Sequence, residues 1–426
     1  MIYPLLRCSH SAACVVGLWF GNAMLSRALL PSLFGTRTYK KGLALALFGL
    51  VGAHAAWALF SDANIVGRLG ITMASVAPVF LTLSLLSIPF AGIFLSFARR
   101  GARSIVAVEP DVEPALPAVD APSLVAPIAA KPAEPAPLAP TRRLTRRGLL
   151  TAAAAVAPAL AMGAGVQGFR RGFSPVAIRK RSLVLPLLPE SLEGLRILQL
   201  SDVHLGVYRQ LGDLEAALDL ASRESPDLVV ITGDFVEHGD LLPDALDLVV
   251  AVRPKLGVVA CLGNHEYFQS ISDIRKTYER KGVPLLVDEA LSLTTDTAKL
   301  SVLGIDDPRS MGGDLRPALE YSLERTLAKS SGDFQLLLSH RPEAILPASE
   351  LDLGLVLSGH THGGQIGFNG KSAFEALSRD GYLWGPYTRA RTGLYTTSGF
   401  GHWYPFRLGC ESELPLLELS RARCTA

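Results

Sequence analysis

The residues best suited to chemistry are aspartate, asparagine and histidine side chains that follow short apolar runs in the second half of the chain. The segments SDVHLG, TGDFVE, LGNHEY, LSHRPE and LSGHTHGGQ each come directly after such a run. Carboxylate, neutral imidazole and amide oxygen together suit borderline or hard divalent ions, namely Mn, Fe, Zn, Ni or Mg. The side chains concerned are Asp202, His204, Asp234, Asn264, His265, His340, His360 and His362. This pattern predicts a metal centre assembled from distant parts of the chain.

The spacing within the motifs supports a shared site. Asp202 and His204 are two residues apart, as are His360 and His362. In an extended backbone, side chains with this spacing project to the same side. The neighbouring glycines at 233, 263, 359, 363 and 364 let the backbone come close to a metal or an anion. No cysteine occupies any of these positions, which argues against a structural zinc or iron–sulfur site.

The distribution of histidines adds weight to a common site. Residues 182–426 contain seven histidines, and five of them lie in these motifs, leaving only His238 and His402. For any single histidine, a hydrogen-bonded core or surface position is the simpler explanation. Chance is a poor explanation for five histidines that follow apolar runs together with two aspartates and an asparagine.

The elements that must position these residues alternate between short apolar runs and amphipathic stretches. Six strands are predicted, at Leu195–Leu200, Leu228–Ile231, Val258–Leu262, Leu300–Ile305, Phe334–Ser339 and Leu353–Ser358. Four helices are predicted between them, at Leu211–Arg223, Leu241–Val252, Ser270–Arg280 and Arg316–Leu327. The alternation indicates an α/β domain with a largely parallel sheet. Ligands of open α/β sheets bind beyond the carboxyl ends of the strands, where the motifs stand.

The ordered series DxH, GD, GNHE, H and GHTHGGQ resembles the calcineurin-like metallophosphoesterase superfamily over about residues 190–422. The resemblance implies a four-layer αββα sandwich with two metals at the sheet ends. GHTHGGQ, SGFG and PFRLGCESELPLLEL together resemble a bacterial, membrane-associated branch of that superfamily. Some members of that branch carry several N-terminal membrane spans, and others carry a twin-arginine leader.

The resemblance also implies a role for each motif residue. Asp202, His204 and His362 would hold one metal. Asn264, His340 and His360 would hold the other, and Asp234 would bridge the pair. Hydroxide formed between the two cations would attack the phosphorus, with the cations clamping the attacking and leaving oxygens. His265 would stabilise the phosphoryl charge or protonate the leaving oxygen, so His265 and Asp234 are the predicted catalytic residues.

Three positions depart from, or add to, the family pattern. Glu266 stands where many relatives have Asp, and we expect it to support the site without binding metal. Arg341 follows His340 where many branch members carry Asn, and it is either a contact to substrate phosphate or a solvated surface charge, with the second favoured. His402, in GFGHW, either meets the substrate or is an ordinary loop histidine.

These residues predict a membrane-anchored, dinuclear metal-dependent phosphoesterase. It would hydrolyse phosphomonoester, phosphodiester or pyrophosphate bonds, on a lipid or cell-envelope substrate. The alternatives are a nuclease or phosphoprotein phosphatase on the same scaffold, or a non-catalytic membrane sensor. A net charge of +2 gives no support to a nucleic-acid partner.

The membrane prediction comes from the first part of the chain. The sequence of 426 residues is 49% hydrophobic and only 19% charged, and the excess of apolar residues lies near the N-terminus. Residues 42–60 and 69–98 are long and apolar enough to cross a bilayer. Residues 12–34 are a weaker candidate, because Arg27 interrupts them. We therefore expect a transmembrane region of two to three helices over 1–103 and a Pro/Ala-rich linker over 104–145.

Residues 146–170 are predicted to be a fourth membrane segment or a signal anchor. Thr145-Arg146-Arg147-Gly148-Leu149-Leu150 resembles a twin-arginine export signal, and the alternative is a stop-transfer helix with basic flanks. The globular domain is expected over 182–426. The resulting prediction is a multi-pass protein of the bacterial inner membrane with its catalytic domain on the periplasmic side. The basic residues between 170 and 181 oppose that orientation under the positive-inside rule.

Overall fold

The computed structural model describes residues 163–422, apart from 296–297, 310–313, 379–380 and 403, together with scattered helical positions between 19 and 53. Gly163–Ala426 belong to one of two compact units of the chain. None of the helices in the described part combines the length and the apolar character that crossing a bilayer requires. The predicted segments 12–34, 42–60, 69–98 and 146–170 lie largely or wholly outside the described residues, as does the linker 104–145.

Two six-stranded sheets form the framework of the described domain. The first has the order β1 (Ala177–Leu185), β14 (Glu413–Arg421), β2 (Arg196–Leu200), β3 (Leu228–Thr232), β4 (Val258–Cys261) and β5 (Leu285–Leu286). The second has the order β12 (Gly385–Arg389), β13 (Thr392–Thr396), β9 (Leu355–Ser358), β8 (Phe334–Leu338), β7 (Lys299–Gly304) and β6 (Glu289–Thr294). A two-stranded hairpin of β10 (Gly367–Phe368) and β11 (Lys371–Ser372) stands apart from both.

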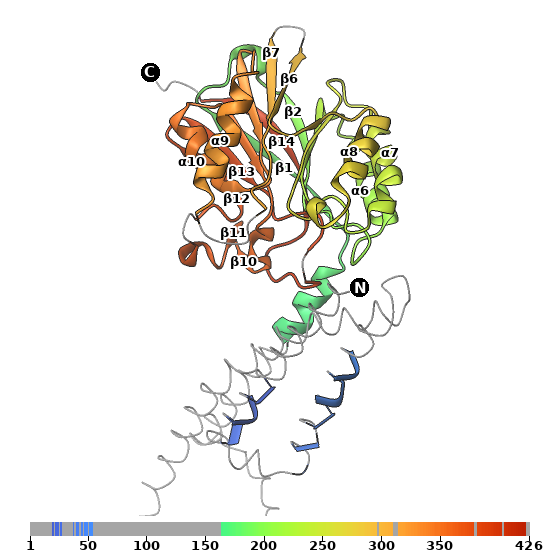
Figure 1. Cartoon of the computed structure of the whole chain (residues 1–426). Helices are drawn as coiled ribbons and strands as arrows, with labels where there is room; N and C mark the ends of the chain where they lie inside the picture. Colours follow the sequence, from blue (N-terminus) through green and yellow to red (C-terminus); the bar gives the residue numbers. More distant parts are fainter. Residues whose placement is uncertain are drawn as a thin grey trace, which may run out of the picture. The chain divides into compact units, whose positions relative to one another are not determined.

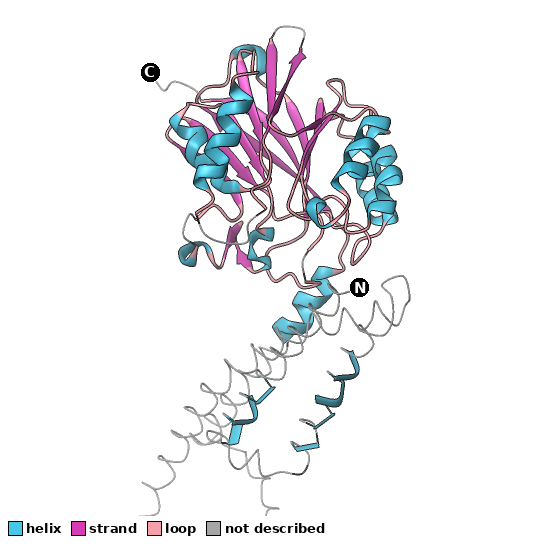
Figure 2. Ribbon diagram, in the orientation of Figure 1, coloured by secondary structure: helices cyan, strands magenta, loops and turns pink. Residues whose placement is uncertain are grey.

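Helices cover the outer face of each sheet, which gives four layers (Figures 1 and 2). The first sheet carries α6 (Leu211–Ser222), α7 (Leu242–Val250) and α8 (Ile271–Arg280), and the second carries α9 (Arg316–Leu327) and α10 (Ile345–Glu350). Three apolar cores follow from this arrangement, one between the two sheets and one under each helical layer. The αββα sandwich expected from the resemblance is therefore present.

Strand composition explains the layering. In β3, Leu228 and Val230 face the core between the sheets, whereas Val229 and Ile231 face the core under α6–α8. A strand covered on both faces gains burial from every residue, so it appears as a continuous apolar run. For this reason the sequence predicts where such strands lie but not which core each of their side chains enters.

The predicted strands and helices are confirmed to within two residues at each end. The six predicted strands divide between the two sheets, and within each sheet they run parallel to one another, as expected. In the first sheet, β14 inserts between β1 and β2, parallel to β1 and antiparallel to β2. The first sheet also begins with β1 at Ala177, ahead of the expected domain start at residue 182.

The two sheets contribute different motifs to one edge of the sandwich. The first three motifs follow β2, β3 and β4 of the first sheet, and the last two follow β8 and β9 of the second. The candidate site is thus built where the carboxyl ends of strands from both sheets meet.

Candidate metal centre

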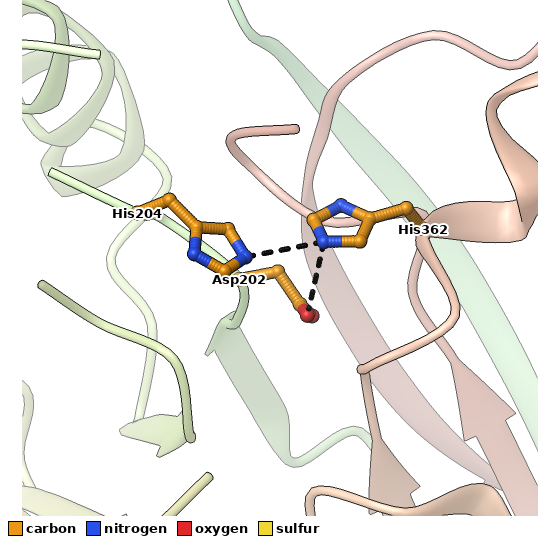
Figure 3. Close-up of side chains that lie close together, drawn as sticks. All are labelled: Asp202, His204 and His362. Atoms are coloured by element: carbon orange, nitrogen blue, oxygen red, sulfur yellow. Dashed lines mark hydrogen bonds and ion pairs between the residues drawn. The ribbon is translucent and has the colours of Figure 1, made fainter. Parts of the chain in front are cut away.

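Asp202, His204 and His362 form the first cluster of possible metal ligands, as the resemblance implied. His204 Nε2 lies 3.1 Å from His362 Nε2, and His362 Nε2 lies 3.5 Å from Asp202 Oδ1 (Figure 3). All three side chains are buried. Two imidazole nitrogens and a carboxylate oxygen that converge in this way offer three ligands to one cation.

Asp234, His340 and His360 form the second cluster. His340 Nε2 lies 3.2 Å from Asp234 Oδ2 and 3.1 Å from His360 Nδ1. The same Asp234 oxygen lies 3.8 Å from His204 Nε2, in the first cluster. Asp234 therefore stands between the two groups, where a bridging ligand has to be.

Asn264 and His265 follow β4 at the same edge. The backbone N–H of His265 donates to Asp234 Oδ1 at 2.8 Å, which ties this loop to the bridging position. Asn264 Oδ1 is buried and accepts no hydrogen bond from the described residues. A buried amide oxygen without a donor is costly, and a cation would satisfy it. The donor set thus fits two divalent ions, and Asn264 offers a further oxygen donor at the same edge.

The backbone at the clustered residues adopts a conformation that side chains other than glycine rarely take. Asp202, His204, Asp234, His360 and His362 have φ angles of 51°, 48°, 52°, 68° and 49°. Each such residue costs about 1–3 kcal/mol and persists only where the surroundings enforce it. The expectation that Asp202 and His204 share a side through extended backbone is therefore wrong, because the chain turns sharply at both residues.

Two of the motif glycines are needed because the backbone approaches the acidic groups closely. A Cβ at Gly359 would lie 2.1 Å from Asp202 Oδ2, and one at Gly263 would lie 2.2 Å from Asp234 Oδ1. The Glu266 carboxylate stabilises the turn at Gly263, because it accepts hydrogen bonds from the backbone N–H groups of Asp234, Phe235 and Gly263. Glu266 thus has the supporting role expected from the sequence.

Hydrogen bonds on the far side of the rings orient the histidines. His340 Nδ1 lies 2.9 Å from the carbonyl oxygen of Thr232, and His204 Nδ1 lies 2.7 Å from Glu237 Oε1. Each contact fixes the ring so that Nε2 faces the cluster.

Glu237 is a functional residue that the sequence reasoning missed. Its Oε1 lies 2.7 Å from His204 Nδ1 and 2.6 Å from His265 Nδ1, so one carboxylate orients both rings. The opposite nitrogen of His265 lies 3.9 Å from Asp234 Oδ2. The available signal was the spacing in GDFVE, which places an acid three residues after Asp234.

Charge and burial act in opposite directions on these groups. Burial lowers the pKa of His204, but the nearby Glu237 outweighs it and raises the value to about 9. Burial lowers the pKa of His340 in the same way, but Asp234 outweighs it and raises the value to about 10. Burial together with neighbouring positive charge holds the pKa of His360 and His362 well below the usual range. Burial opposes ionisation of Asp234 as well, yet the imidazoles around it keep its pKa well below normal. A cation would compete with protons on His204 and His340.

Arg341 is not a solvated surface charge, and the favoured sequence interpretation of it is wrong. The residue is only 3% exposed. Its Nε donates to Asp307 Oδ2 at 2.8 Å, and its Nη1 lies 2.7 Å from His360 Nε2. The buried carboxylate of Asp307, which follows β7, compensates the guanidinium, and this partner could not be identified from the sequence.

His402 is buried at the margin of the site. Its ring stacks on Tyr208, with centroids 5.2 Å apart, and neither ring nitrogen has a hydrogen-bond partner among the described residues. Burial, followed by the charges of Arg407 and Arg209, holds its pKa well below the usual range. The ring is therefore a neutral packing group.

Replacing Glu237 with Gln should weaken metal binding while preserving shape. The substitution removes the charge that orients His204 and His265, and losses of this kind cost about 10–100-fold in affinity. Calorimetric titration of the purified chain with Mn²⁺ measures the effect. Glu215→Gln, on the exposed face of α6, is the matched control. Equal affinities in the two variants would exclude the orienting role.

Comparison with known proteins agrees with this geometry. Residues 195–364 match the family model described as calcineurin-like phosphoesterase. An uncharacterized metallophosphoesterase of Bacillus subtilis is 31% identical over 271 residues, which cover 61% of this chain and 91% of that protein. A phosphodiesterase of Escherichia coli is 28% identical over 53% of this chain and 82% of its own length.

A relative from Danio rerio is named as a transmembrane protein with a metallophosphoesterase domain. It is 30% identical over 60% of this chain, and the match spans 60% of that protein. The matched family segment contains every residue of the two clusters described above. The chain therefore belongs to the calcineurin-like phosphoesterase family and is a metal-dependent phosphoric ester hydrolase.

Proposed function

We propose that this protein hydrolyses a phosphodiester or a related phosphoric ester at a centre of two divalent cations. The observation that carries the proposal is the position of Asp234, whose Oδ2 lies within 3.8 Å of Nε2 atoms from both histidine clusters. The phosphodiester is favoured among the esters because the Escherichia coli relative is named a phosphodiesterase.

The proposed ligands follow the two clusters. Asp202, His204 and His362 would hold one cation, and His340 and His360 would hold the other, with Asp234 shared between them. Asn264, whose buried Oδ1 has no donor among the described residues, would complete the second set. Two cations held there would neutralise phosphoryl charge and make a water between them acidic enough to supply hydroxide. The metal is one of Mn, Fe, Zn, Ni or Mg, the ions that suit this mixture of oxygen and nitrogen donors.

His265 is the proposed general acid. Its Nε2 points toward the cluster, 3.9 Å from Asp234 Oδ2, and its Nδ1 lies 2.6 Å from Glu237. Its Nε2 is thus placed to give a proton to the leaving oxygen. Glu237 itself remains ionised, because hydrogen bonds to His204 and His265 outweigh burial and hold its pKa well below the usual range.

Asp234→Asn should abolish hydrolysis of bis-p-nitrophenyl phosphate. An amide cannot supply the shared anionic oxygen, so we expect the rate to fall at least about a hundredfold and Mn²⁺ uptake to drop. Chelation of the wild-type protein should stop turnover, and added Mn²⁺ should restore it. Asp219→Asn, on the exposed face of α6, is the control. Wild-type turnover in Asp234→Asn would overturn the proposal.

Arg341 is the proposed contact to a substrate phosphoryl oxygen. Nε and Nη2 are engaged by Asp307, at 2.8 Å and 3.4 Å, while Nη1 faces His360 Nε2. His360 Nδ1 points to the second cluster, 3.1 Å from His340 Nε2. A neutral imidazole that binds a cation through Nδ1 carries its proton on Nε2 and cannot accept a hydrogen bond there. Nη1 then needs another acceptor, and an anionic phosphoryl oxygen supplies it.

Arg341→Gln should lower kcat/KM for bis-p-nitrophenyl phosphate about 10–100-fold, the range expected for loss of a hydrogen bond to a charged group. Most of the change should lie in KM, and bound Mn²⁺ should stay at the wild-type level. Arg325→Gln, on α9, serves as the control. Loss of metal together with activity would assign Arg341 a purely structural role.

We propose further that the protein is anchored in the bacterial inner membrane and acts on a lipid or cell-envelope phosphate outside the cytoplasm. Support comes from the apolar segments 42–60 and 69–98, from the twin-arginine-like sequence at 145–150, and from the name of the Danio rerio relative. The basic residues between 170 and 181 would then contact anionic headgroups.

The orientation can be tested with a reporter that is active only outside the cytoplasm, fused after residue 426. The fusion should be active, and replacement of Arg146 and Arg147 by Lys should abolish that activity, because export systems of this type read the arginine pair. The neighbouring pair Arg142 and Arg143, replaced in the same way, is the control. An inactive fusion of the unmodified chain would refute the proposed orientation.

A further inference from the structure

Several exposed apolar side chains stand on the loops of the metal centre or on segments attached to those loops. Six of them, here called the apolar rim, are Phe173, Phe268, Phe368, Phe374, Leu377 and Tyr404. Phe368 is 86% exposed and Leu377 is 81% exposed, so these two have almost no contact with the rest of the domain. Side chains this apolar are not held in water for stability, and their grouping requires another explanation.

Two rim residues touch the metal-site loops directly. Phe268 packs edge-on against His265, with ring centroids 5.1 Å apart. Phe374 covers Gly364, where a Cβ would lie 2.5 Å from the ring. Gly364 belongs to the turn η5 (His362–Gln365), which begins with a cluster histidine.

The other rim residues stand on segments fastened to the same loops. Gln365 donates to the carbonyl oxygen of Tyr404 at 2.7 Å. Phe173 contacts the ring of His402, whose loop is tied to Asp202 through Gly401. Phe368 lies on β10, and Leu377 lies in η6 (Glu375–Leu377), directly after β11, which packs on η5. Each rim residue therefore stands on a metal-site loop or on a segment attached to one.

Elsewhere on the described domain, exposed large apolar residues stand on separate elements. Leu220 lies on α6, Tyr321 on α9 and Leu351 at the end of α10. Single exposed residues of this kind are normal in soluble domains. The concentration of exposed phenylalanine at the catalytic edge is what distinguishes the rim.

The chain enters the domain at this same end. The helix over residues 163–172 lies at the end of the domain that carries β10 and β11 (Figure 1). The backbone N–H of Arg407 donates to the carbonyl oxygen of Gly168 at 2.8 Å, which fixes this helix to the loop that follows Tyr404. The apolar segments at 42–60 and 69–98 precede this entry point in the sequence.

We propose that the apolar rim binds the hydrocarbon part of an amphiphilic phosphoester held in a lipid layer, while the phosphate lies at the metal centre. The inference rests on the proposed function, and it specifies the substrate class of that site. One ligand that contacts both surfaces must join a phosphoester to an apolar group. Burial of exposed aromatic and aliphatic side chains then adds binding energy that a small soluble ester cannot recover.

The test compares two substrates with the same leaving group, methyl p-nitrophenyl phosphate and hexadecyl p-nitrophenyl phosphate, with the full-length chain in detergent micelles. The wild type should favour the hexadecyl ester by about tenfold or more in kcat/KM. The double variant Phe368→Ser/Leu377→Ser should reduce that ratio about tenfold, and Phe368→Ser alone should give an intermediate value. Leu220→Ser/Leu351→Ser is the matched control and should keep the wild-type ratio.

The possible outcomes separate the two proposals. No hydrolysis of either ester by the wild type contradicts the proposed function itself. If the wild type hydrolyses both esters with equal kcat/KM, or if the ratio changes equally in the two double variants, the proposed role of the rim is refuted. The proposed phosphoesterase function is unaffected by either result. An equal fall of kcat/KM for both esters in the rim variant, with bound Mn²⁺ unchanged, also overturns the proposed role of the rim. The rim would then affect the metal centre and not the binding of the hydrocarbon.

Discussion

The structure depends on one buried carboxylate placed among imidazoles. Asp234 Oδ2 has Nε2 atoms at 3.2 Å, 3.8 Å and 3.9 Å, contributed by His340, His204 and His265. Burying such a charge is expensive unless positive partners surround it. His204 and His340, whose pKa values are raised to about 9 and about 10, supply positive partners at this point. Glu237 lies on the far side of two of these three rings, His204 and His265, and contacts the Nδ1 atom of each.

Much of the fold followed from the sequence, since strands buried on both faces are continuous apolar runs. The six predicted strands and four predicted helices are present. Assignment of the strands to two sheets did not follow, because periodicity does not show which strands pair. Short or polar strands were missed for a related reason. β10 and β11 have two residues each, and β6 is largely exposed, so none of the three strands gives an apolar run.

The candidate site was visible in the sequence as residue types at strand ends, and the structure brings Asp202, His204 and His362 together as predicted. The residues that orient them were not visible. Glu237 and Asp307 act through contacts that only the tertiary fold creates, and a lone acid in a loop resembles a solvated charge. Arg341 was misjudged for this reason, since its exposure depends on a partner that follows a different strand.

The position of β14 makes the first sheet depend on the last strand of the domain to be synthesised. This strand, Glu413–Arg421, lies inside the first sheet and separates β1 from β2, with Ala177 aligned against Glu413. Until it emerges from the ribosome, β1 has no neighbour and one edge of β2 stays open. Contacts between such distant segments form slowly, and open strand edges invite aggregation. The nascent domain therefore exposes these strand edges until its final strand is in place.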